Sequence, residues 1–140
     1  MKRIEAHDRR RAAIHEAGHL VVADHFGVPT RGAEIWRVHK PASGERTWSG
    51  TAGISRKAPP DDLRRVAVAG AIAEAIWTGD DDPDFYDPHV MSASDWGWSG
   101  EEPGEPGDAL LDAADAVFTL LRHDWPALLR EARQLMLDAR

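Results

Sequence analysis

The chain has 140 residues, no cysteine and a formal net charge of −7 at pH 7. The absence of cysteine excludes a disulfide framework and a thiolate metal site, so any metal ligands must be His, Asp or Glu. The negative charge argues against a general nucleic-acid binder.

One domain is expected for a chain of this length, and it is long enough to bury a hydrophobic core. No apolar run approaches the ~18–20 residues that span a bilayer. The first eight residues lack the apolar core of a signal peptide. We therefore expect a cytoplasmic protein with no membrane partner.

The first expected helix runs from about Asp8 to Phe26. Asp8 is suited to the N-cap, Gly27 suits the position after the helix, and Pro29 prevents its continuation. We expect the three arginines at 9–11 to cover the solvent face of this helix.

Residues 14–19 of this helix (IHEAGH) contain an H-E-x-x-H motif. Positions four apart on a helix differ by ~40° of rotation and ~6 Å of rise, so His15 and His19 project from one face. Two imidazoles so placed can bind one Zn²⁺, and Glu16 then lies where it can accept a proton from water activated by the ion. The motif therefore predicts a zinc-dependent hydrolase with Glu16 as its catalytic base.

The alternative interpretation is a helix that carries two solvated histidines by chance. The residues around the motif are small or apolar, as at Ile14, Val21 and Val22, and this composition is typical of a buried helix. A buried helix does not carry two histidines and a glutamate unless they have partners, which favours the metal site.

Two strands are expected next, at 33–38 and 47–55, with turn-forming residues at 41–46 between them. Gly50 and Gly53 weaken the second strand. They also allow another backbone to approach closely, as an edge strand that pairs with a peptide would require. The second strand is therefore our candidate for a substrate-binding edge.

A second helix is expected from the two prolines at 59–60, which are followed by acids in the first turn, to Trp77, with Gly79 as its stop. Its middle, residues 66–75, is small or apolar apart from Glu74, which is the profile of an enclosed helix. A carboxylate there needs a hydrogen-bond donor, a cation or a metal-bound imidazole nearby. The alternative is that Glu74 points outward through a gap in the packing.

The acidic segment 79–91 lacks the spacing of an EF-hand, so a solvated loop is expected there. An aromatic and glycine-rich stretch follows. Its Trp96 and Trp98 either pack over the core and close a cleft or form a contact surface for a partner. Two amphipathic helices are expected at about 108–122 and 126–139.

A catalytic zinc usually has three protein ligands and a water, so a third ligand is required. His25 lies where H-E-x-x-H-x-x-G-x-x-H enzymes place their third histidine, but Val22 stands at the position of the helix-breaking glycine. If the helix continues, His25 lies ~9 Å beyond His19 and ~240° around the axis, out of reach of the same ion.

Three segments resemble, in the same order, motifs in the peptidase domain of FtsH-type AAA+ metalloproteases. Residues 14–23 (IHEAGHLVVA) resemble its H-E-A-G-H-A-x-V-A, residues 68–74 (VAGAIAE) its L-x-G-G-R-A-A-E, and residues 91–95 (MSASD) its T-x-G-A-S-N-D. The resemblance implies an α+β, mainly helical zincin-like metalloprotease domain with a small β-sheet beside the H-E-x-x-H helix. We expect it here as a stand-alone domain without the ATPase module.

By this resemblance His15 and His19 are zinc ligands and Glu16 is the catalytic carboxylate. The resemblance also makes Asp95 the third ligand. It places Glu74 close to the site, where we expect its carboxylate to orient an imidazole.

The sequence departs from the family pattern around the third ligand. The block that ends at Asp95 aligns only with a one-residue slip, because the family's Asn is missing, and glycines and prolines interrupt the helix expected after it. Glu74, His89 and His25 therefore remain alternatives to Asp95.

The motif and the resemblance together predict a zinc metalloendopeptidase. Its substrates would be peptides or unfolded segments, because no ATPase module would pull a folded protein apart. A delivery partner and a homo-oligomer both remain open. The alternative from another class is a non-catalytic or partner-activated metal-binding module with the same fold, and a further alternative is hydrolysis of a non-peptide amide.

Overall fold

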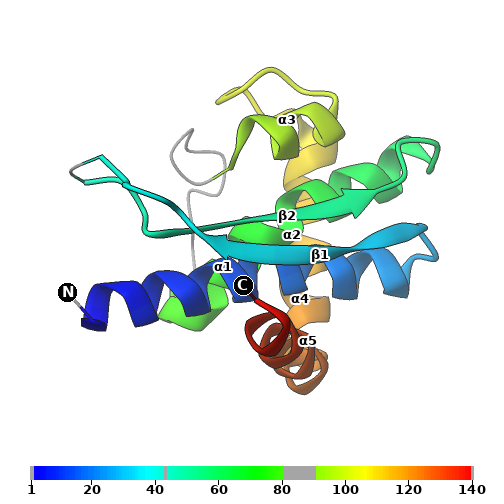
Figure 1. Cartoon of the computed structure of the whole chain (residues 1–140). Helices are drawn as coiled ribbons and strands as arrows, with labels where there is room; N and C mark the ends of the chain where they lie inside the picture. Colours follow the sequence, from blue (N-terminus) through cyan, green and yellow to red (C-terminus); the bar gives the residue numbers. More distant parts are fainter. Residues whose placement is uncertain (1, 43, 81–90, 140) are drawn as a thin grey trace.

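The expected order of helices and strands is present in the structure, a computed structural model that describes residues 2–42, 44–80 and 91–139 (Figure 1). This part of the chain contains five helices and one two-stranded antiparallel sheet, so the fold is mainly helical and of the α+β class. The elements are α1 (Lys2–His25), β1 (Thr30–Arg37), β2 (Trp48–Ile54), α2 (Pro60–Thr78), α3 (Ala93–Ser99), α4 (Asp108–His123) and α5 (Trp125–Asp138). None of the described helices is both long enough and apolar enough to cross a membrane.

The start of α1 differs from the prediction, because the helix begins at Lys2 and Asp8 lies within it. Residues 2–7 contain neither Gly nor Pro, so no residue there breaks the helix. Asp8 is not an N-cap. Its Oδ2 accepts hydrogen bonds from the backbone N of Thr47 at 2.7 Å and from Thr47 Oγ1 at 3.0 Å. The carboxylate therefore fastens the β1–β2 connection to α1.

The boundaries of α2 confirm the prediction from proline and glycine. Pro60 occupies the first turn and Gly79 follows the last. Gly79 has a φ of 79° in the left-handed region, and its N–H faces the carbonyl oxygens of Ala75 and Ile76, which would otherwise lack partners at the helix end. Gly27 takes a φ of 69° just after α1 in the same way.

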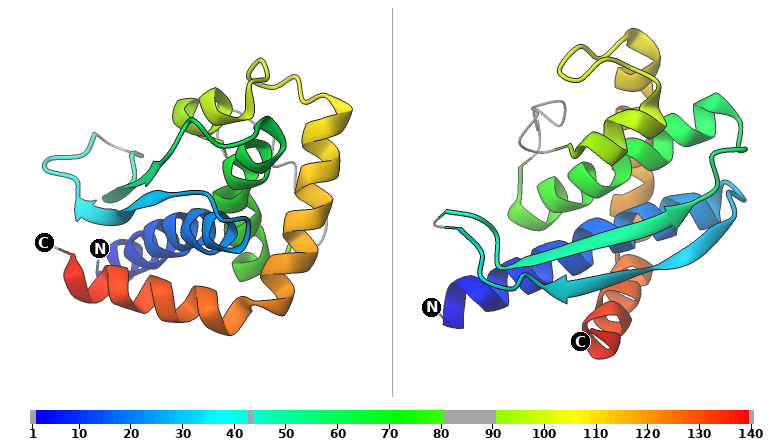
Figure 2. Two further views of the ribbon diagram at one scale, coloured as in Figure 1. Left: turned by 90° about the vertical axis from the view of Figure 1, so that its right-hand side faces the viewer. Right: turned by 45° about the horizontal axis from the view of Figure 1, so that its top comes forward.

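The sheet lies across α1, with β1 and β2 antiparallel and Ile35 paired with Gly50 (Figures 1 and 2). Ile35 and Ala52 are buried, whereas Trp36, the next residue along β1, is 39% exposed. This alternation is typical of a sheet with one face on a core. On the side away from β1, strand β2 faces α2 and α3 (Figure 2).

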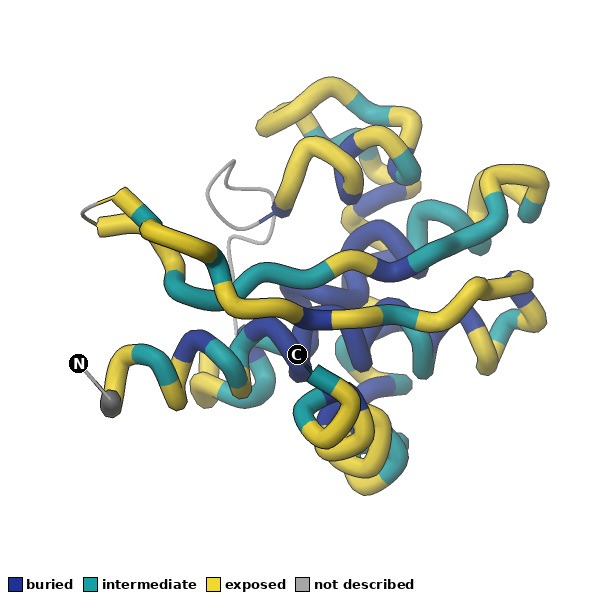
Figure 3. Tube along the Cα trace, viewed as in Figure 1, coloured by how far each residue is buried: buried dark blue, intermediate teal, exposed yellow. Residues whose placement is uncertain are grey.

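Buried segments of α1 and α2 meet in the interior of the molecule (Figure 3). A Cβ added at Gly18 of α1 would lie 2.6 Å from the carbonyl oxygen of Ala69 in α2, so the two helix backbones are nearly in contact. Helices α4 and α5 pack against this pair and contribute larger side chains. Their fully buried members are Leu110, Val117, Leu121 and Leu128.

Candidate active site

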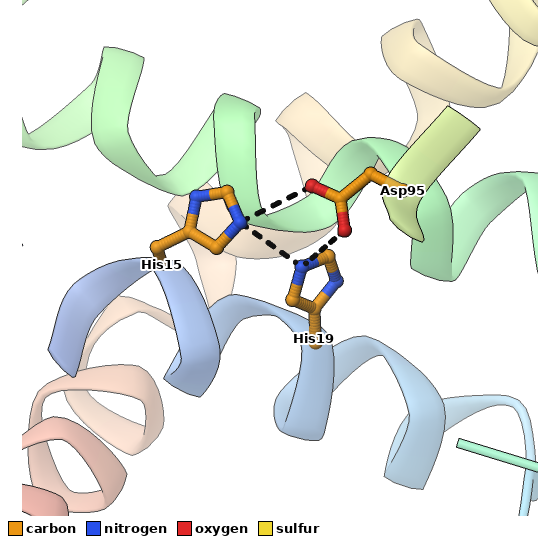
Figure 4. Close-up of side chains that lie close together, drawn as sticks. All are labelled: His15, His19 and Asp95. Carbon is orange, nitrogen blue, oxygen red and sulfur yellow. Dashed lines mark hydrogen bonds and ion pairs between the residues drawn. The ribbon is translucent and has the colours of Figure 1, made fainter. Parts of the chain in front are cut away.

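Two histidines of α1 and one aspartate of α3 meet in the interior (Figure 4). His15 Nε2 lies 3.2 Å from His19 Nε2 and 3.2 Å from Asp95 Oδ2, and His19 Nε2 lies 3.2 Å from Asp95 Oδ1. All three residues are buried. They are the group of the described residues whose donor atoms lie close enough together to hold a metal ion.

In each ring the other nitrogen, Nδ1, forms a hydrogen bond with a residue of α2. His19 Nδ1 lies 2.6 Å from the backbone oxygen of Val66 and must donate to it, because a carbonyl oxygen can only accept. His15 Nδ1 lies 2.6 Å from Oε2 of Glu74. Partners of this kind fix the ring orientation of metal-binding histidines and keep Nε2 unprotonated as the ligand atom.

Three groups that accept hydrogen bonds, and can donate an electron pair to a metal, therefore converge on one point when both rings are neutral. Such a group is stable only with a proton or a cation between its members. Burial lowers the pKa of His15, but Asp95, Glu74 and Glu16 outweigh it and raise that pKa to about 10. Ligand atoms on a tetrahedral zinc with bonds of ~2.0–2.1 Å are separated by about 3.3–3.4 Å. The observed 3.2 Å spacing thus fits a small cation in place of the proton.

Asp95 reaches this point because α3 begins just before it. The hydroxyl of Ser92 accepts a hydrogen bond from the backbone N of Asp95 at 3.2 Å, which is the N-cap arrangement. Glycines and prolines were expected to interrupt the helix after Asp95. The helix continues through Gly97 and stops at Gly100, whose φ is 72°. Burial opposes ionisation of Asp95, but the two histidines outweigh it and hold the pKa of the carboxyl well below its usual range.

Two glycines leave space for site residues. A Cβ at Gly70 of α2 would lie 2.4 Å from His15 Nε2, so the ring can occupy its position only against a glycine. A Cβ at Gly50 of β2 would lie 2.8 Å from Cγ of Glu16. The Glu16 side chain thus occupies space that Gly50 leaves, and the backbone approach of a peptide at this strand stays a prediction.

His15 borders an open cavity of about 540 Å³ between β2, α1 and the start of α3. Glu16 lines this cavity beside His15 and Asp95 and is only 7% exposed. Burial raises the pKa of the Glu16 carboxyl, although the nearby histidines act in the opposite direction. The carboxylate therefore faces the same space as the convergent ligand atoms, and it is a stronger base than an ordinary exposed glutamate.

The Glu74 side chain points into the protein and not outward through a gap in the packing. Its second oxygen, Oε1, forms an ion pair with Arg11. Arg11 contacts Glu74 Oε1 at 3.5 Å and donates to the backbone oxygen of Trp48 in β2 at 3.2 Å. Burial opposes ionisation of Glu74, but the hydrogen bond from His15 and the positive charges of Arg11 and Arg46 outweigh it and lower its pKa.

The position of Arg11 corrects the prediction that all three arginines at 9–11 cover the solvent face. Arg10 is exposed, whereas the Arg11 side chain is 13% exposed and lines the cavity. Helical periodicity could have indicated the difference, because Arg11 is four positions before His15 and shares its face. Arg11 is thus a site residue that the sequence analysis missed.

His25 and Glu74, the two alternative third ligands that lie in the described part of the chain, contribute no atom to the convergent group. Helix α1 continues through Val22, which is fully buried, and His25 at its end is exposed and meets the ring of Phe26 edge-on at 4.8 Å. His89 lies outside the described residues. Glu74 contacts His15 at the nitrogen opposite the convergent atoms.

The positions of Trp96 and Trp98 in α3 favour the first of the two alternatives, packing against the core, rather than a contact surface for a partner. Trp96 is 3% exposed and belongs to the core. Trp98 is half-buried, lines the cavity, and its ring meets that of His19 edge-on at 5.1 Å. Trp96 therefore packs in the core, and Trp98 borders the cavity on the side of α3.

A scan of the chain against models of known protein families gives no match, and a search of curated protein sequences gives none.

Proposed function

We propose that this protein is a zinc-dependent peptidase with a zincin-like fold, related to the peptidase domain of FtsH-type proteases. His15, His19 and Asp95 would hold the ion. The observation that carries the proposal is the convergence of His15 Nε2, His19 Nε2 and Asp95 at mutual distances of 3.2 Å, with both Nδ1 atoms already hydrogen-bonded.

A zinc ion bound there would polarise a substrate carbonyl and lower the pKa of water. Glu16 accepts the proton of the attacking water, because its carboxylate lies in the same cavity and its pKa is raised. Glu16 then returns the proton to the nitrogen of the breaking amide bond. Overall, one water molecule is added across the C–N bond.

The strand that lines the cavity supports an extended peptide as substrate. Residues 48–52 of β2 line one wall, and among the described residues β1 is the single strand that pairs with β2. A strand with an unpaired edge can bind a peptide by backbone hydrogen bonds, independently of its sequence. Peptides and unfolded segments fit this mode of binding.

The decisive experiment compares the wild type with Glu16→Gln at equal zinc occupancy. The two side chains are nearly isosteric, so zinc content should be unchanged. Cleavage of an unfolded protein substrate should fall by roughly 10²–10⁴-fold, because the general base is lost. A chelator should stop the wild type, and added zinc should restore it.

Two results would contradict the proposal. Undiminished cleavage by Glu16→Gln would mean that Glu16 is not the base. A wild type that holds zinc but cleaves nothing in a broad peptide library would favour the non-catalytic or partner-activated metal-binding module.

A further inference from the structure

One arginine at the end of the cavity has no role in the proposed mechanism. Arg46 lies just before β2 and lines the cavity, and its side chain is 49% exposed. Among the described residues its one ion-pair partner is Glu74, whose Oε1 lies 3.8 Å from an Arg46 terminal nitrogen. This distance is too long for a hydrogen bond.

The neighbouring acids are already engaged by other groups. Glu74 Oε1 is shared with Arg11 at 3.5 Å, and its other oxygen bonds His15. Glu45 also lines the cavity, but its Oε2 accepts a hydrogen bond from the backbone N of Ala42 at 3.1 Å. Asp8 bonds Thr47 through Oδ2. A guanidinium has five N–H donors, so Arg46 retains donors that can reach a group entering the cavity.

The guanidinium of Arg46 is close enough to the proposed metal site to contact a peptide bound there. The contacts from Arg46 to Glu74 and from Glu74 to His15 place it no more than about 11 Å from His15 Nε2, roughly three residues of extended chain. Arginine binds carboxylates in a planar, two-pronged geometry, which neither lysine nor a neutral donor reproduces.

We propose that Arg46 binds a carboxylate of the substrate and thereby selects peptides with a negative charge within about three residues of the bond to be cleaved. This inference rests on the proposed peptidase function and names its substrate class. The carboxylate can belong to an acidic side chain or to the C-terminus of the peptide. The chemistry at Arg46 is the same for both sources, and they are separated by experiment.

Binding can be measured without turnover. Zinc-loaded Glu16→Gln would be titrated calorimetrically with peptides of one sequence that carry Glu or Gln at a single varied position and a free or amidated C-terminus. The Glu peptide or the free C-terminus should bind about 10–100-fold more tightly than its neutral counterpart, and Arg46→Gln should remove this preference.

Charge reversal separates recognition from a structural role. Arg46→Glu should bind peptides with Lys more tightly than peptides with Glu at the same position. This reversal of the charge preference would not follow from a structural disturbance around Arg46. The matched control is Arg56→Gln, because Arg56 is exposed just beyond the other end of β2 and does not line the cavity. The control should leave peptide selectivity unchanged.

The outcomes separate this inference from the proposed function. Cleavage by the wild type with equal affinity for acidic and neutral peptides, or selectivity that survives Arg46→Gln, would overturn the inference and leave the peptidase standing. Charge-selective binding without cleavage by the wild type would sustain carboxylate recognition and overturn the peptidase. The absence of any peptide binding would overturn the inference outright.

Discussion

The α1–α2 crossing buries small and polar residues beside its apolar ones, whereas the faces of α4 and α5 that pack against α2 and α1 bury apolar residues, mostly large ones. At the crossing, Gly18 and Gly70 meet alanines and a histidine ring so closely that neither position accepts a Cβ. The buried polar and charged residues include His15, Glu16 and His19 of α1. The buried faces of α4 and α5 carry only apolar side chains among the described residues, namely Leu110, Ala113, Ala114, Val117, Leu121, Leu128, Ala132 and Leu135.

If the proposed metal site is correct, this difference separates metal binding from the stability of the fold. Small residues bring two backbones so close that side chains on one helix reach carbonyl and carboxylate groups of the other, as His19 reaches Val66. Large aliphatic residues instead provide apolar surface for burial, which is the main favourable term in folding. Changes at the crossing should therefore affect metal binding, and changes in α4 or α5 should affect stability alone.

The largest effect is expected for Asp95→Ala. Loss of one of three ligands should weaken zinc binding by about 10³-fold or more. His25→Ala should leave the zinc affinity unchanged, because His25 lies at the exposed end of α1. Zinc dissociation constants measured with a competing chelator test both variants. The reverse pattern would show that His25 is the ligand.

A glycine substitution tests the close approach itself. The Cβ of Gly70→Ala would overlap the His15 ring, so the ring must move and zinc affinity should fall by about 10²-fold. Gly79→Ala is the matched control, because a Cβ there meets no atom within 4 Å and only its φ of 79° is unfavourable. It should cost about 1 kcal/mol of stability with no change in zinc affinity. Equal zinc affinities in the two variants would contradict the tight crossing.

Leu121→Ala tests the other half of the comparison. Leu121 is fully buried, and its truncation should reduce the free energy of unfolding by about 2–5 kcal/mol. Zinc affinity and stoichiometry of the folded protein should stay at the wild-type values. Denaturant unfolding and zinc titration measure the two quantities separately. A parallel loss of zinc affinity would show that the α4–α5 pair also shapes the site.

Glu74→Gln should have a smaller effect on the metal, about a 10–100-fold loss of zinc affinity, because the amide bonds His15 Nδ1 more weakly than the carboxylate does. Asp61→Asn is the control on the same helix, since the Asp61 side chain is 74% exposed and pairs only with Arg64 among the described residues. Comparable losses in both variants would indicate a general electrostatic effect rather than orientation of His15.

The smallest expected effect is a pH dependence of the metal-free protein. The pKa of His15 is raised from 6.5 to about 10 by its carboxylate neighbours. The stability that the bound proton contributes is therefore complete below about pH 6.5 and lost as the pH rises through about 10. The Tm of the metal-free protein should fall over this range, by less in His15→Gln. A Tm that rises with pH would contradict this assignment.

Sequence patterns predicted most of the fold because its boundaries have local causes. The prolines at 59–60 and the residues Gly27 and Gly79 act on adjacent backbone, so α2 and the end of α1 are found where expected. The predicted start of α1 was wrong because Asp8, which was expected to be the N-cap, bonds Thr47 instead, a residue far along the chain. No local pattern reveals such a contact.

The same distinction applies to the site. His15 and His19 lie on one helix, so their spacing alone placed them together, and the apolar surroundings of Glu74 indicated a buried partner. Asp95 could be placed only through a family resemblance, because α3 comes from a distant part of the chain. The roles of Gly70 and Arg11 depend on which helix face meets which neighbour, and this requires the folded structure.

The contact between His15 and Asp95 joins residues 80 positions apart. A metal ion bound by both closes a long loop of chain, and the unfolded chain cannot hold these groups together without a large loss of entropy. Metal binding is therefore linked to folding, and the apparent stability rises with the logarithm of the free metal concentration above its dissociation constant. Because 80 positions separate the two residues, the full ligand set should assemble only after local structure such as α1 has formed. The metal would then stabilise the folded protein rather than initiate its folding.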